Sequence, residues 1–147
     1  MRYWLWVYFS FEGRIGRRTW WGAISLLGLI HAGVVTAAIS IVPHEGIWRQ
    51  GHKIALYILS ALSIYNSLAL NVKRFHDQGM SGLWNLLAIL VNMSGWLLFT
   101  RGTEAAEDTP MLISAVVWVW LLIQLGLMPG QRCKNDYGEE PGKAPAA

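Results

Sequence analysis

The chain has 147 residues, of which 54% are hydrophobic and only 14% charged, with a formal net charge of +3. A soluble domain carries about 25% charged residues, so this composition predicts a membrane protein and argues against a soluble all-α domain. The positive charge is typical of membrane topology and headgroup attraction, and no basic stripe indicates nucleic-acid binding.

Two segments open the chain. Residues 3–9 (YWLWVYF) are too short to cross a bilayer and precede a group of arginines, which predicts an interfacial segment on the inner leaflet. Residues 20–42 form the first long apolar stretch, with His31 as its one ionisable residue. This stretch exceeds the about 7–15 apolar residues of a signal peptide, and Ala38-Ile39-Ser40 is a poor cleavage site. We therefore expect it to remain in the protein.

Three further apolar stretches, 54–72, 83–100 and 111–128, contain no charged side chain. A helix needs about 20 residues, within a range of about 17–25, to cross a bilayer. The sequence thus predicts an all-α membrane protein built as a four-transmembrane-helix bundle. It would form a single domain over 1–141, with a short cytoplasmic tail that is frayed at 142–147.

The basic residues predict the orientation. Nine of the 12 Lys and Arg residues lie before the first stretch, at 73–74 or in the tail, and three lie in the other two loops. Because cytoplasmic loops carry an excess of Lys and Arg, both termini and the loop 73–82 should be cytoplasmic.

Small and polar residues recur on single faces of the predicted helices, among them Ser63, Ser67 and Asn71 on the second and Asn85 and Asn92 on the third. Such faces commonly hold membrane helices together. The alternative is a small oligomeric transporter or channel that uses His31 and these Ser/Asn faces. The absence of Asp and Glu from every stretch favours packing, with His31 as a neutral imidazole bonded to a neighbouring Ser or Asn.

Three polar motifs should meet at the cytoplasmic face: 11–21, 73–82 and 135–141. Gly79 permits a turn and Ser81 is placed to cap the following helix, whose N-terminus beside Arg74 and His76 would attract an anion. The residues predicted to bind a ligand are Arg14, Arg17, Arg18, Arg74, His76, Asp77, Ser81, Gly82, Asn135 and Tyr137. Alternatively, the basic residues only set topology, and Asp77 pairs with an arginine of the N-terminal segment.

No catalytic constellation is visible in the sequence. Cys133 is the single cysteine, so no Cys-based metal site can form. His76-Asp77 lacks further metal ligands on its side of the membrane, and no nucleophile elbow or phosphate-binding loop occurs. We therefore expect a non-enzymatic protein without a cofactor or a metal.

The three motifs read FEGRIGRRTWW at 11–21, KRFHDQGMSGLW at 73–84 and NDYGEEP at 135–141. Together they resemble the domain of unknown function 805 family of small bacterial inner-membrane proteins. Departures include Lys73 in place of an Arg and Leu83 in place of an aromatic residue. The resemblance implies a multi-pass protein of the bacterial inner (plasma) membrane and brings no activity with it. Its predicted partners are the lipid bilayer, anionic lipid headgroups, and a protein partner or a second copy of the chain.

Overall fold

A computed structural model describes residues 2–41, 47–99 and 109–141. These residues form α1 (Arg2–Phe9), α2 (Arg17–Ile41), α3 (Ile47–Asp77), α4 (Leu83–Phe99), α5 (Thr109–Leu121) and the π-helix η2 (Leu122–Leu127). Within the described ranges no strand occurs, and the one β-bridge joins Asn135 to Gly138. The all-α prediction is therefore confirmed for this part of the chain.

Two helices are long and apolar enough to cross a membrane. The qualifying stretches are Arg17–Ala38 in α2 and Ile54–Asp77 in α3, which contain most of the predicted spans 20–42 and 54–72. The apolar parts of the other two helices, Leu83–Ser94 and Met111–Leu127, are shorter. The predicted span 83–100 ends just outside the described residues. Four membrane crossings therefore stay a prediction.

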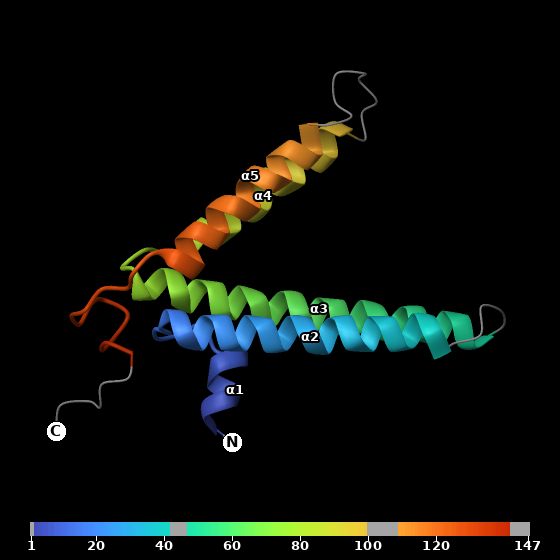
Figure 1. Ribbon diagram of the computed structural model, residues 1–147, viewed down its shortest axis with the longest axis horizontal. Coiled ribbons are helices and arrows are strands. Elements are labelled where there is room, and N and C mark those ends of the chain that lie inside the picture. Colours follow the sequence, from blue (N-terminus) through green and yellow to red (C-terminus); the bar gives the residue numbers. More distant parts are fainter. Residues whose placement is uncertain (1, 42–46, 100–108, 142–147) are drawn as a thin grey trace.

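The long helices form two hairpins, α2 with α3 and α4 with α5, which diverge from one shared end (Figure 1). At that end η2 packs against α2 and α3. The predicted single bundle is not confirmed, because the hairpins separate along most of their length (Figure 1). The short α3–α4 turn holds them together only at the shared end, and uncharged polar faces give weak attraction elsewhere.

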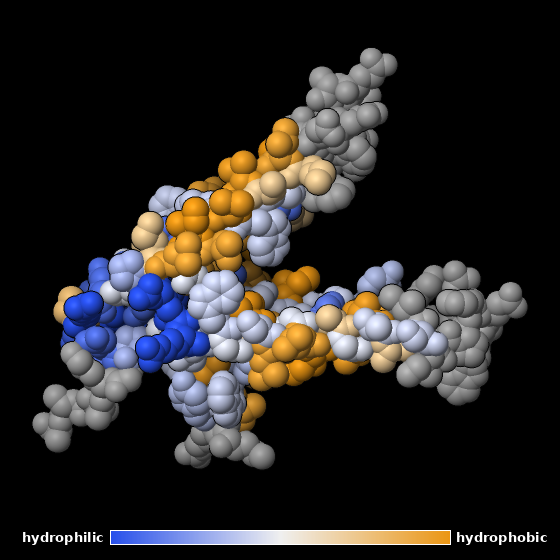
Figure 2. Space-filling view, viewed as in Figure 1, coloured by the Kyte–Doolittle hydropathy of each residue, from blue (hydrophilic) through white to orange (hydrophobic). Residues whose placement is uncertain are grey.

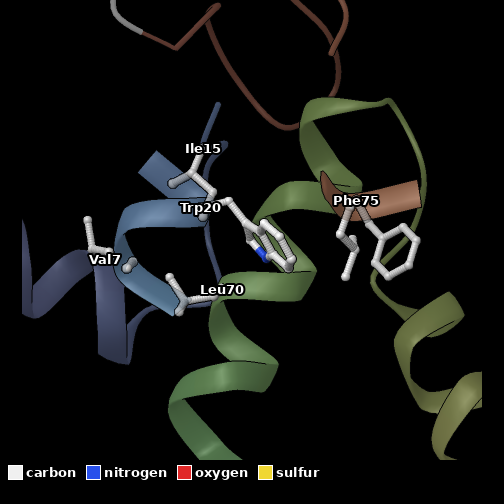
Figure 3. Packing of buried hydrophobic residues seen from close by; sticks show 7 residues of the cluster. Val7, Ile15, Trp20, Leu70 and Phe75 are labelled. Atoms are coloured by element: carbon white, nitrogen blue, oxygen red, sulfur yellow. The ribbon is translucent and has the colours of Figure 1, made fainter. Parts of the chain in front are cut away.

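The hydrophobic core lies at this shared end (Figure 3). It joins side chains from α1, the loop before α2, α2, α3 and η2: Val7, Ile15, Trp20, Ala23, Leu70, Phe75 and Leu125. Elsewhere large apolar side chains are exposed, with Leu29 and Tyr57 each 72% and Met111 77% accessible. Figure 2 shows apolar surface along both hairpins and a hydrophilic region at the shared end. Apolar patches of this extent indicate a surface that contacts a membrane or a partner.

The α3–α4 turn follows the sequence prediction. Gly79 has φ of 74°, a conformation that costs glycine little, and the Ser81 hydroxyl accepts the Leu83 N–H at 3.3 Å. A Cβ on Gly82 would lie 2.7 Å from Val72 Cγ1. The turn therefore requires glycine at 82 because α4 starts directly against α3.

Candidate functional site

The shared end carries a polar cluster, here called the polar base, formed by residues 11–17, the end of α3 and the tail 128–141. At its centre Asp77 bridges two arginines. Its Oδ1 lies 3.1 Å from Arg14 Nη2, and its Oδ2 lies 2.5 Å from Arg74 Nη1. The side chains of Arg14, Arg74 and Asp77 are only 1%, 0% and 5% accessible. Buried charges persist only when paired and hydrogen-bonded, so these three residues form one interdependent group.

Arg14 fastens the tail to the rest of the fold. Its Nη1 donates to the carbonyls of Cys133 (2.7 Å) and Gly138 (3.1 Å). Its Nη2 donates to the Gln131 carbonyl and to Asp77, and its Nε also donates to Asp77. A guanidinium has five N–H donors, and these bonds engage all three of its nitrogens. Arg14 is therefore fully used by the fold and has no donor left for a ligand.

Arg74 fastens the second hairpin in the same way. Its Nε donates to the Leu125 carbonyl at 2.8 Å and its Nη2 donates to the Met128 carbonyl. The neighbouring Arg17 donates to the Leu127 carbonyl at 2.9 Å. Carbonyls at the end of a helix lack partners within it, so these arginines cap η2. The α4–α5 hairpin is thereby tied to α2 and α3 through charge-assisted hydrogen bonds.

Lys73 performs the corresponding role for α1. Its ammonium donates to the carbonyls of Trp6 and Val7 and lies 4.8 Å from the centre of the Trp6 ring. Cations are favourable at a helix C-terminus. Tyr8 adds a second attachment, since its hydroxyl donates to the Ala23 carbonyl at 3.0 Å. Burial raises the pKa of this hydroxyl.

The tail folds back onto α3 through His76. The His76 ring stacks on Tyr137 with centroids 3.8 Å apart and planes 5° apart, and its Nδ1 lies 3.2 Å from the Gly13 carbonyl. The Asn135 amide donates to the His76 carbonyl at 2.9 Å. The sequence motif around 135–141 thus serves to attach the tail to the α3–α4 turn.

The structure brings together most of the predicted site residues, but several of them form hydrogen bonds that hold the fold together. Arg14 and Arg74 are buried and both bond Asp77, so Asp77 pairs with an arginine of the N-terminal segment, as the alternative interpretation expected. Arg17 and Arg18 are exposed. The role predicted for these residues in ligand binding therefore stays a prediction. The ten residues divide into the buried three named above, the stacked or bonded His76, Asn135 and Tyr137, the turn residues Ser81 and Gly82, and the exposed Arg17 and Arg18.

Other residues at the shared end were missed by sequence reasoning. Gln78 and Gln124 bond each other, with Gln124 Nε2 2.6 Å from Gln78 Oε1. Gly130 lies so close to Asp77 that a Cβ would stand 1.9 Å from Oδ2. Neither the Gln78–Gln124 bond nor the Gly130–Asp77 contact has a local sequence signal, because each joins residues more than 40 positions apart.

His31, which the sequence predicts to lie within the membrane, has a hydrogen-bond partner on a neighbouring helix, as expected of a residue that serves packing. His31 Nδ1 lies 2.9 Å from the Ser63 hydroxyl of α3. Among the residues that the structure describes, no group of three or more His, Cys, Asp or Glu side chains could hold a metal ion.

Residues 8–139 match the family model described as "Protein of unknown function (DUF805)", and the chain belongs to this family. It is similar to the uncharacterized protein YiiR of Escherichia coli strain K12 and to the same protein of strain O157:H7. Each is 31% identical over 135 residues, which covers 90% of this chain and 86% of the relative. No solved structure matches the chain significantly. The resemblance read from the three motifs is confirmed.

Proposed function

We propose that this chain is a non-enzymatic, multi-pass protein of the bacterial inner membrane that binds anionic lipid headgroups at its polar base. The observation that carries the proposal is the division of its surface. Exposed apolar side chains run along both hairpins, and the charged groups collect where the hairpins meet (Figure 2). Apolar helices with one charged end fit a bilayer whose hydrocarbon surrounds the hairpins and whose headgroups contact the base.

The orientation in this proposal follows the Lys and Arg distribution, with the polar base and both termini in the cytoplasm and four helices crossing the membrane. The exposed aromatic side chains of α1, including Tyr3, Trp4 and Phe9, would lie in the interface beside the base. Trp and Tyr favour that region because their rings are apolar with a polar edge.

A recess of about 210 Å³ at the base is the proposed headgroup site. Arg17 and Arg132, both exposed, line it together with Gly130, Gln131 and the acidic residues Asp77 and Glu140. Arg17 also begins α2, where the helix dipole favours an anion. A lipid phosphate would bind between the two arginines, while Arg14 and Arg74 hold the surrounding backbone. Arg18 is exposed but does not line this recess, so we expect it to contribute only long-range attraction.

Native mass spectrometry of the detergent-purified chain tests this site. Phosphatidylglycerol and phosphatidylcholine with identical acyl chains are offered in equal amounts. Wild type should retain the anionic lipid preferentially, Arg17→Gln should reduce that preference, and Arg18→Gln removes the same charge from the same helix turn as a matched control. If both variants elute as folded protein and lose the preference for the anionic lipid equally, the arginines act only by general electrostatic attraction. That result would refute headgroup binding in the recess.

A further inference from the structure

Two adjoining cavities occupy the space between the hairpins, here called the interhairpin wedge; Figure 2 shows the hollow between the two arms. The larger, about 480 Å³, is lined by residues of α2, α3, α5 and η2. The smaller, about 210 Å³, lies between α3, α4 and α5. Both share Asn71 and Trp118 as lining residues. Their size and mainly apolar walls with a few polar groups are typical of sites for small hydrophobic ligands.

Trp20, Asn71 and Asn85 form a row of hydrogen bonds in this wedge, and the direction of each bond can be assigned. The Trp20 indole N–H donates to Asn71 Oδ1 at 3.0 Å. Because an indole can only donate, the Asn71 oxygen must face it, and the Asn71 amide nitrogen points the other way. That nitrogen lies 3.4 Å from Asn85 Oδ1. The Asn85 oxygen is thus used as an acceptor, and its Nδ2 remains as a donor.

Asn85 Nδ2 has no acceptor among the residues that the structure describes, although Asn85 is only 3% accessible. Buried amide groups are nearly always hydrogen-bonded, and an unsatisfied one is costly. Asn85 lines the smaller cavity. Asn85 Nδ2 is thus a donor beside this cavity that the described residues leave without an acceptor.

We propose that the interhairpin wedge binds a diacyl glycerolipid, with one acyl chain between the hairpins and an ester carbonyl accepting the Asn85 Nδ2 proton. This inference rests on the proposed membrane location. The depth agrees with it, because Asn71 precedes Arg74 by three residues, which is about 4.5 Å along a helix. In a bilayer the ester carbonyls lie just inside the phosphates, so a lipid whose phosphate reaches the polar base has its carbonyls at this level.

The chemistry of the walls selects this class of ligand. An uncharged amide donor satisfies a carbonyl oxygen, whereas a carboxylate or phosphate at this position would be buried without a counter-charge. The apolar walls, which include Trp118 and Leu121, accommodate a hydrocarbon chain. The wedge is thus a second contact for the lipid whose headgroup the polar base would hold.

The test compares two lipids that differ only in the proposed acceptor. Diacyl phosphatidylglycerol has ester carbonyls, and the dialkyl ether lipid with the same headgroup and chain length has none. Retention of each is measured by native mass spectrometry on the full chain. Since a hydrogen bond is worth about two- to tenfold in affinity, wild type should retain the ester lipid about fivefold better, and Asn85→Leu should abolish this preference.

Asn92→Leu is the matched control, because Asn92 lines the same cavity but lies seven residues, or about 10 Å, further along α4. It should keep the ester preference. Equal retention of ester and ether lipids by wild type would overturn the inference even if no variant folds. A lost headgroup preference with an intact ester preference would instead refute the recess at Arg17, so the two failures are distinguishable.

Discussion

The buried Asp77 should dominate the stability of the polar base. Asp77→Asn keeps the size of the side chain but removes the negative charge between Arg14 and Arg74. It also replaces one carboxylate oxygen by an amide donor, which would face one of the two guanidinium groups. The bonds at risk have N···O distances of 3.1 Å and 2.5 Å, and the groups are almost inaccessible to water. Removing one partner of a buried ion pair costs about 3–5 kcal/mol, because the remaining charge is left unpaired.

The measurement is the free energy of unfolding in mixed micelles, with sodium dodecyl sulfate titrated into a mild detergent and the fluorescence of the nine tryptophans as the signal. Glu139→Gln is the control, since it breaks the Lys134–Glu139 pair whose side chains are 73% and 49% accessible. An exposed pair is worth about 0–1 kcal/mol. If Asp77→Asn costs no more than Glu139→Gln, the reasoning about the buried group is wrong.

Two other substitutions have clear expectations. Gly130→Ala should destabilise the chain about as much as Asp77→Asn, because the added Cβ would stand 1.9 Å from Asp77 Oδ2. Gly33→Ala is the control, since a Cβ there meets nothing within 4 Å, and it should be neutral or stabilise the chain by up to about 1 kcal/mol. Comparable losses of unfolding free energy in the two variants would contradict this. His31→Ala should lose the Ser63 bond and about 1 kcal/mol without changing ion flux into proteoliposomes, and a flux abolished by this substitution would favour the transporter alternative.

The parts of the structure that the sequence could predict are local. The turn at Gly79, the hydroxyl of Ser81 at the start of α4 and the bond between His31 and Ser63 each follow from a residue type at a helical position. In each case the chemistry of one side chain limits its surroundings.

The burial of Arg14 and Arg74 could not be predicted in the same way. Their acceptors are mostly backbone carbonyls, and Arg14 meets Cys133 across 119 residues of sequence. Any residue offers a carbonyl, so the sequence has no pattern that marks one as a partner. The arginines were accordingly expected to be available for ligands, and the structure shows them holding η2 and the tail. The divergence of the two hairpins could not be predicted for a related reason. The sequence of a polar helix face does not show whether that face contacts another helix or a bound molecule.

The central claim is that the chain crosses the inner membrane with its polar base in the cytoplasm, and Cys133 allows the most direct test. It is the single cysteine and is exposed. A membrane-impermeant maleimide should label it in inside-out vesicles but not in intact spheroplasts, and Thr103→Cys in a Cys133→Ser chain should show the reverse. Labelling of Cys133 in intact spheroplasts, or recovery of the chain in the soluble fraction, would contradict the account.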